Sequence, residues 1–248
     1  MMRHISTKLG RLADLAASMA VVLLIATPAA AYTGGAVSNG GSIKGKITVS
    51  GKQDETKEVV KDKSFCGGSV PAEKFIVSGD GGLKNVIVRI DAIDSGKPID
   101  KEGNFTVSNV KCRFDPHVMV APKGATMKVR NDDPVLHNSH FYLVQADSSK
   151  KNVINLALPR QGVEIGKKKI LRKPGLLSVK CDAHDFMQAW IWVAENPYAE
   201  VTDASGSFNM SDVPAGSHTL TIWHEELGEK TVDVTVEAGK AANVDFSF

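Results

Sequence analysis

The chain has 248 residues, of which 42% are apolar, 23% are charged and 6% are aromatic. These proportions exclude an intrinsically disordered chain, a collagen-like repeat and a disulfide-dense miniprotein. The formal net charge of +2 is too small to predict a nucleic-acid-binding surface, and three cysteines are too few for a disulfide scaffold.

The first 31 residues have the pattern of a secretory signal peptide. Three basic residues precede an apolar run from Leu15 to Ala26, and alanines at positions 29–31 supply the small residues that a signal peptidase requires. The apolar run is well short of the ~20 residues needed to span a bilayer. We therefore expect residues 1–31 to be removed on export, with an uncleaved anchor as the alternative.

Removal of this peptide takes away three of the 30 basic residues and one of the 28 acidic residues, so the mature chain is formally neutral. The charge balance therefore predicts no partner, and in particular no nucleic acid. Export predicts a periplasmic or secreted protein without stable membrane insertion after cleavage, in a compartment where disulfides persist.

Short alternating or β-branched runs recur through the rest of the chain, and turns rich in glycine and proline separate them. No long segment has the 3.6-residue period of an amphipathic helix. This pattern predicts an all-β protein built from β-sandwiches. The predicted strands are Ile43–Val49, Lys84–Ile90, Asn104–Val110, Thr126–Asn131, Val153–Leu158, Leu176–Lys180, Ala189–Val193, His218–Trp223, Thr231–Val236 and Asn243–Phe248.

A short loop between two predicted strands carries three side chains that bind soft metals. Cys181, His184 and Met187 follow one another at intervals of three residues, so a compact loop can aim all three at one point. A further ligand should come from another strand, and His137 offers it. One thiolate, two imidazoles and a weak axial thioether form the ligand set of a blue-copper electron-transfer site.

The order and spacing of these residues resemble the copper signature of cupredoxins, and the loop spacing is that of the amicyanin type. The resemblance covers roughly Gly96–Ala194, about the size of one cupredoxin domain. The segment Phe114–Val118 also resembles the cupredoxin chain before the strand of the first histidine. The residues that carry the signature are Asn131, Asp133, His137, Asn138, Cys181, His184 and Met187.

The resemblance implies a Greek-key cupredoxin β-sandwich over residues 94–196 that binds one copper ion, cycling between Cu(I) and Cu(II). It makes His137, Cys181 and His184 the equatorial ligands and Met187 the axial ligand. An electron carrier of this kind is not an enzyme, and we see neither a separate histidine cluster for a catalytic metal nor an open coordination position.

The same resemblance implies roles for neighbouring residues and a partner. Asn138 would tie the His137 strand to the ligand loop through hydrogen bonds. His184 would lie near the protein surface, with Phe186 as an apolar collar, and would form the port for electrons. A redox protein such as a c-type cytochrome or a periplasmic oxidoreductase would dock there weakly and transiently.

Other histidines and another metal remain as alternatives. His140 is the rival of His137, either replacing or supplementing it, although positions 137 and 140 of one strand point to opposite faces. The Cys-x-x-His pair could be half of a zinc site, but no second pair follows at zinc-finger spacing. We expect His117 to be structural, and His218 and His224 to be surface or packing residues.

If Cys181 binds copper, two cysteines are left over. In an exported protein the simplest expectation is a disulfide between Cys66 and Cys112, which would restrict a long loop of the unfolded chain. A second metal site that uses Cys112 and His117 is the alternative. A single cysteine in the ligand loop argues against a binuclear copper centre, which needs two bridging thiolates.

The segments on either side of the cupredoxin-like region resemble the two halves of a carboxypeptidase regulatory-like β-sandwich. Residues 201–208 form an Asp-x-x-Gly turn between strands, and Pro214-x-Gly216 begins the next strand. The segment Gly41–Ile47 resembles the opening of the same module. We therefore expect a discontinuous, smaller sandwich from residues 41–93 with 197–248, into which the cupredoxin domain is inserted and which carries no chemistry of its own.

Three functions fit these expectations. The first is an exported electron carrier with a mononuclear blue-copper site. The second is a copper-binding or delivery protein without a redox partner, which would transfer its metal readily. The third is an extracellular interaction protein in which copper is structural, so that partner binding would survive the loss of Cys181.

Overall fold

The structure, a computed structural model, describes residues 31–248, so nearly all of the predicted signal peptide lies outside the described residues. The regular structure of the described chain is almost entirely strand, with one short helix, α1 (Lys63–Cys66). The all-β class predicted from the sequence is therefore confirmed. No helix among residues 31–248 has the length and apolar character needed to cross a membrane.

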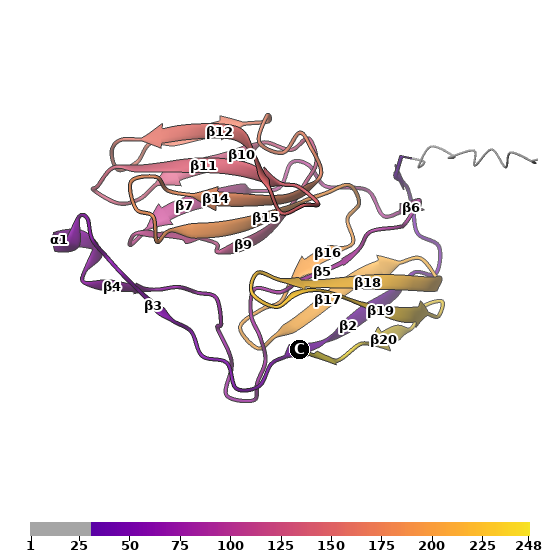
Figure 1. Cartoon of the computed structure of the whole chain (residues 1–248). Coiled ribbons are helices and arrows are strands. Elements are labelled where there is room, and N and C mark those ends of the chain that lie inside the picture. The colour runs from indigo at the N-terminus through magenta and orange to yellow at the C-terminus, as the bar shows by residue number, and fades with distance from the viewer. Residues whose placement is uncertain (1–30) are drawn as a thin grey trace, which may run out of the picture. The chain divides into compact units, whose positions relative to one another are not determined.

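The strands follow one another with short connections, as Figure 1 shows. The first eight are β1 (Thr33–Gly34), β2 (Gly41–Thr48), β3 (Thr56–Glu58), β4 (Ser69–Pro71), β5 (Ile87–Ile90), β6 (Ser95–Gly96), β7 (Phe105–Val110) and β8 (Arg113–Asp115). The next seven are β9 (Val118–Pro122), β10 (Met127–Asn131), β11 (His137–Val144), β12 (Lys150–Leu158), β13 (Glu164–Lys167), β14 (Gly175–Lys180) and β15 (Gln188–Ala194). The last six are β16 (Ala199–Val201), β17 (Ser207–Val213), β18 (Gly216–His224), β19 (Gly228–Val236), β20 (Ala241–Asn243) and β21 (Phe246–Ser247).

The first sandwich combines a four-stranded sheet, β13-β10-β7-β8, with a five-stranded sheet, β12-β11-β14-β15-β9. The pairs β7–β10 and β9–β15 are parallel, although both lie in sheets whose other pairs are antiparallel. Alternate residues of β10 are buried, as expected for a strand with one face on a core. The core between the two sheets includes Phe114, Met127, Phe141 and Ile191.

The second sandwich takes its strands from both sides of the first in the sequence. One sheet has the order β16-β5-β18-β19 and the other has the order β17-β2-β20. β2 pairs antiparallel with β17 and parallel with β20, and β5 pairs antiparallel with β16 and β18. Their core includes Ile43, Val88, Phe208 and Ile222. The domain boundaries 41–93, 94–196 and 197–248 stay predictions.

A buried carboxylate links the two sandwiches close to the ligand loop. Glu225, between β18 and β19, is hydrogen-bonded to Nε2 of His117 and accepts a 2.8 Å hydrogen bond from the indole N–H of Trp190 in β15. The ring of Trp190 packs edge-on against Trp223 at 5.5 Å between centroids. Hydrogen bonding and aromatic packing therefore hold the second sandwich against the strand that leaves the ligand loop.

Residues 50–80 form an excursion from the second sandwich that we call the arm. Its base is closed where the N–H of Val49 donates to the carbonyl oxygen of Gly81 at 2.9 Å. The arm carries β3, α1 and β4 and is the indigo segment that bears these labels in Figure 1. A disulfide between Cys66 and Cys112 fastens it to the first sandwich, as predicted from the sequence.

Candidate metal centre

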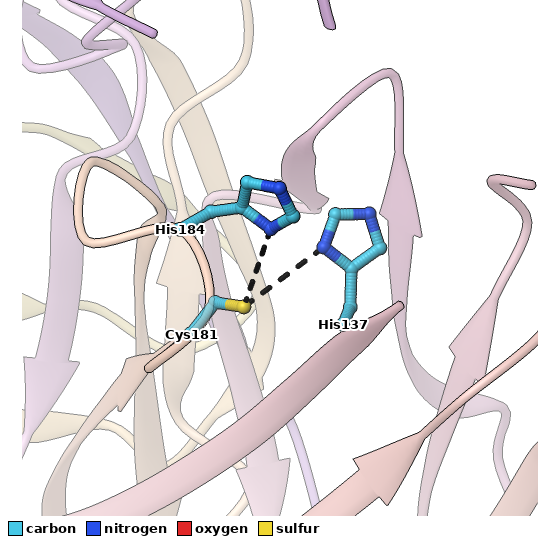
Figure 2. A group of neighbouring side chains, drawn as sticks. All are labelled: His137, Cys181 and His184. Atoms are coloured by element: carbon cyan, nitrogen blue, oxygen red, sulfur yellow. Dashed lines mark hydrogen bonds between the residues drawn. The ribbon is translucent and has the colours of Figure 1, made fainter. Parts of the chain in front are cut away.

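Three buried side chains from two segments of the first sandwich meet at one point. His137 is the first residue of β11, whereas Cys181 and His184 lie in the loop between β14 and β15. The sulfur of Cys181 lies 3.9 Å from Nδ1 of His137 and 3.8 Å from Nδ1 of His184 (Figure 2). The two imidazole centroids are 4.7 Å apart. The structure thus brings together the three predicted equatorial ligands.

The spacing of these three atoms fits a bound metal ion. A metal held in a trigonal plane by bonds of about 2.0–2.3 Å separates its ligand atoms by about 3.5–4.0 Å. The sulfur–nitrogen distances of 3.8 and 3.9 Å lie in that range. All three residues are buried, so a metal there would be shielded from water. A cysteine with two histidines is a donor set suited to copper.

Met187 is also buried, at 2% exposure, and belongs to the same core as Cys181. Its N–H donates to the carbonyl oxygen of His184 at 3.0 Å, which turns the chain back towards β15. The ligand loop is therefore short and internally hydrogen-bonded. The assignment of Met187 as the axial ligand stays a prediction.

Asn138 makes the hydrogen bonds that were expected between the His137 strand and the ligand loop. Its main-chain N–H donates to the sulfur of Cys181 at 3.5 Å. Its side-chain oxygen accepts from the N–H of Asp182 at 2.7 Å and from that of Ala183 at 3.2 Å. This residue therefore fixes the loop relative to β11 and places a donor against the thiolate that would bind a metal.

Each imidazole presents Nδ1 to the sulfur and Nε2 to a carboxylate. Nε2 of His137 lies 2.8 Å from Asp133, and Nε2 of His184 lies 3.0 Å from Asp62. A hydrogen on Nε2 that is donated to a carboxylate leaves the lone pair of Nδ1 free for a metal. The two carboxylates thus select the tautomer that the site requires.

Burial sets the protonation of the metal-free site. It lowers the pKa of His137 below its ordinary value, although the hydrogen bond to Asp133 acts in the opposite sense, so the imidazole is neutral. Burial raises the pKa of the Cys181 thiol, although three main-chain N–H groups partly oppose the rise. Metal binding would therefore release a proton from Cys181.

The expectation that His184 lies near the surface is wrong. Its side chain is 0% exposed because Asp62 of the arm covers the Nε2 edge of the ring. Sequence reasoning assigned no role to Asp62 or Asp133. Asp133 had a usable signal, since it precedes His137 by four residues within the motif. Asp62 had none, because it lies 122 residues from the histidine that it contacts.

His140, the rival of His137, faces away from the three-residue cluster. Its Nδ1 lies 3.0 Å from Asp182 and 2.8 Å from the hydroxyl of Tyr142, and its ring stacks on that of Tyr142. The arrangement supports the expectation that positions 137 and 140 point to opposite faces. In this structure His140 hydrogen-bonds to Asp182, the residue that follows Cys181 in the ligand loop.

The remaining histidines have packing roles. His117 is buried beside Glu225, and His224 is buried and stacked on Phe75. Nε2 of His218 lies 2.8 Å from the carbonyl oxygen of Pro214. The alternative metal site built on Cys112 and His117 is wrong, because the disulfide occupies the sulfur of Cys112.

Comparisons with known proteins concern both sandwiches. Residues 191–248 match the family model of the carboxypeptidase regulatory-like domain. No curated protein sequence matches the chain.

Among solved structures, the chain is similar to a copper-containing nitrite reductase from Thermus scotoductus SA-01, with 23% identity and a TM-score of 0.31 over 44% of this chain and 26% of that one. It thus spans about a quarter of the nitrite reductase chain. A reduced mutant of amicyanin is 18% identical, with a TM-score of 0.31 over 38% of this chain and 84% of that one. A purple cupredoxin from Nitrosopumilus maritimus is 18% identical, with a TM-score of 0.29 over 37% of this chain and 100% of that one.

Proposed function

We propose that this protein is a periplasmic or secreted electron carrier that binds one copper ion through His137, Cys181 and His184, with Met187 as the axial ligand. The observation that carries the proposal is the buried triangle of one sulfur and two Nδ1 atoms, with sulfur–nitrogen distances of 3.8 and 3.9 Å. The chemistry of the donor set supports copper over a hard cation, because thiolate and thioether are soft ligands.

When bound, copper would supply one-electron chemistry by alternating between Cu(I) and Cu(II). The residues of the chain would hold the ligands in one arrangement for both states. Asn138 ties the ligand loop to β11, and Asp133 holds the ring of His137 in place. A frame that does not rearrange keeps the barrier to electron exchange low, which is the property that a carrier needs.

The burial of the ligands favours a carrier over a delivery protein. A protein that hands its metal to another must expose at least one ligand to the acceptor, whereas His137, Cys181 and His184 are all buried. Tight retention is therefore expected, and transfer of copper to a strong Cu(I) chelator should be slow. Rapid and complete transfer would favour the delivery function instead.

The partner that we propose is a redox protein, such as a c-type cytochrome or a periplasmic oxidoreductase. Docking would be weak and transient, because an electron carrier must leave after each transfer. A structural copper site in an interaction protein is the competing proposal. It predicts that Cys181→Ser abolishes copper binding and leaves binding to the partner unchanged.

The visible spectrum of the mature protein loaded with Cu(II) tests the proposal. We expect an intense thiolate-to-copper absorption that is absent in Cys181→Ser. His140→Gln is the matched control and should keep the band, since His140 faces away from the cluster. A colourless wild-type protein would reject the blue-copper site, and loss of the band in His140→Gln would reject the ligand assignment.

A further inference from the structure

We propose that Asp62 is a positioning residue of the metal centre and that the arm which carries it closes the site at His184. This inference rests on the proposed copper site for its redox consequence only. The closure itself is a property of the metal-free protein. Three features support it: the contact between Asp62 and His184, the hydrogen bonds and disulfide that hold the arm, and the open space between the arm and the ligand loop.

The first observation is the contact between Asp62 and His184. Oδ2 of Asp62 lies 3.0 Å from Nε2 of a ring that is completely buried, while the Asp62 side chain is 32% exposed. Asp62 therefore stands between the imidazole and water. A buried ring N–H without an acceptor is costly, and this carboxylate supplies the acceptor.

The second observation is that the main chain holds Asp62 firmly. Its carbonyl oxygen accepts from the N–H groups of Phe65 at 3.0 Å and Cys66 at 2.9 Å, in the turn of α1. Its φ angle is 54°, in the left-handed region that residues other than glycine seldom adopt. This conformation persists because α1 and the contact with His184 both fix it.

The third observation concerns the disulfide. Cys66 ends α1 and is bonded to Cys112, whose N–H donates at 2.8 Å to Asp133. The N–H of Lys111 donates to the same carboxylate at 2.6 Å. The segment that anchors the arm is therefore also the segment that holds the carboxylate of His137, so one covalent link joins the supports of both histidines.

The fourth observation is the open space between the arm and the ligand loop. A cavity of about 370 Å³ is lined by residues of the arm, of the ligand loop and of the β18–β19 turn. Its walls include Lys57, Ala72 and Lys74 from the arm, and Asp185 and Phe186 from the loop. Because the arm does not fill this space, the hydrogen-bonded contact between Asp62 and His184 has a large part in keeping His184 covered.

Two consequences follow for the site. Water, an incoming ion or a thiol reagent can reach His184 and Cys181 from this side only when the arm moves away. In addition, the negative charge of Asp62 lies one imidazole ring from the metal position. Negative charge stabilises Cu(II) relative to Cu(I), so Asp62 should lower the reduction potential of the bound copper.

The reactivity of Cys181 in the metal-free mature protein tests the closure. Cys181 is the single free thiol of the chain, so a thiol-specific chromogenic reagent reports on it alone. Loss of a charge-assisted hydrogen bond should raise the rate of reaction in Asp62→Ala about tenfold. Asp62→Asn keeps the acceptor oxygen and should give a smaller increase.

Glu58→Gln is the matched control, because Glu58 is an exposed carboxylate of the same arm whose side chain lies 3.5 Å from Lys63. Its rate should equal that of the wild type. An unchanged rate in Asp62→Ala, or an equal acceleration in Glu58→Gln, would overturn the proposal. Circular dichroism shows whether Asp62→Ala folds. If it does not fold, the reaction rate of Cys181 in Asp62→Asn decides the outcome.

The copper-loaded protein provides a second readout that a purely structural role would not change. Asp62→Asn should raise the reduction potential, whereas Glu58→Gln should not. If the wild-type protein shows no blue absorption, the proposed function is wrong. The reaction rates of Cys181 in the metal-free variants would still test whether the arm covers the site. A blue protein with unchanged thiol rates and an unchanged potential would reject the arm proposal alone.

Discussion

The main-chain N–H of Asn138 donates to the sulfur of Cys181 across 3.5 Å, although 43 residues separate the two in sequence. The same asparagine accepts two N–H groups of the ligand loop through its side chain. The strand that supplies one ligand therefore also fixes the loop that supplies the others. Asn138 therefore contributes directly to the rigidity of the site.

Asn138→Ala should destabilise the protein and loosen the site. Removing the side-chain oxygen leaves the N–H groups of Asp182 and Ala183 without their acceptor, which costs about 1–3 kcal/mol in the free energy of unfolding. Urea denaturation of the metal-free protein measures this loss. Asn152→Ala, at an exposed position of β12, is the control and should change the free energy by less than about 0.5 kcal/mol. Equal effects of the two substitutions would contradict the role of Asn138.

Met187→Leu should keep the fold and the blue absorption but raise the reduction potential. Leucine has a similar volume, so the core should lose less than about 1.5 kcal/mol, whereas loss of the thioether removes electron density that stabilises Cu(II). Redox titration of the copper-loaded protein measures the potential. Met127→Leu, in the same core, is the matched control and should leave the potential unchanged. If both variants keep the wild-type potential, Met187 is a packing residue.

Replacement of both disulfide cysteines by serine should lower the free energy of unfolding by about 4 kcal/mol. This figure follows from the loop-closure entropy of a bond that spans 46 residues. Denaturant unfolding of the double variant measures the loss. The reactivity of Cys181 should rise as well, because the arm loses its covalent fastening. A stable variant with an unreactive Cys181 would show that packing alone holds the arm.

The stability of the contact between the sandwiches should depend on pH through Glu225. Burial by itself raises the pKa of this carboxyl, but the hydrogen bond and charge of His117 and the indole N–H of Trp190 together outweigh burial and hold the pKa below its ordinary value of 4.5. A depressed pKa means that the stabilisation is fully present above the unfolded-state value and is lost as the pH falls through the folded-state value.

Glu225→Gln should therefore lower the free energy of unfolding by about 1–3 kcal/mol at neutral pH, where the carboxylate is ionised. The difference from the wild type should shrink as the pH falls below the ordinary carboxyl pKa of 4.5 and the wild-type carboxyl takes up a proton as well. Glu237→Gln, which affects an exposed pair with Lys240, is the control and should show little difference at either pH. If the difference in the free energy of unfolding between Glu225→Gln and the wild type does not change with pH, Glu225 stabilises the contact through its shape and not through its charge.

Local patterns in the sequence were sufficient for most of the fold. Alternating and β-branched runs predicted strands that the structure contains: the run Thr126–Asn131 includes all of β10, and the run Leu176–Lys180 lies within β14. The strand from His137 to Val144 was not among the predicted runs, because its first four residues are polar. The first three are nevertheless buried; His137 belongs to the three-residue cluster, and Asn138 hydrogen-bonds to the ligand loop. The polar residues of the candidate site therefore interrupt the alternating pattern at this strand.

The arm could not be predicted in the same way. Residues 50–80 have no periodic pattern, and nothing in their composition indicates which surface they cover. The contact between Asp62 and His184 depends on a tertiary arrangement that spans 122 residues. The prediction that His184 lies near the surface assumed the family arrangement without such a segment, whereas Asp62 of the arm covers the ring.

The single disulfide also bears on how the chain reaches its native state. Three cysteines allow three pairings, and two of these pairings would consume the sulfur of Cys181, a ligand of the proposed metal site. The native pair, 46 residues apart, closes the shortest loop of the three, so chain entropy favours it over the others. Burial of Cys181 in the folded core then removes it from exchange. In an exported protein, early closure of this short loop would therefore keep Cys181 available for the proposed metal.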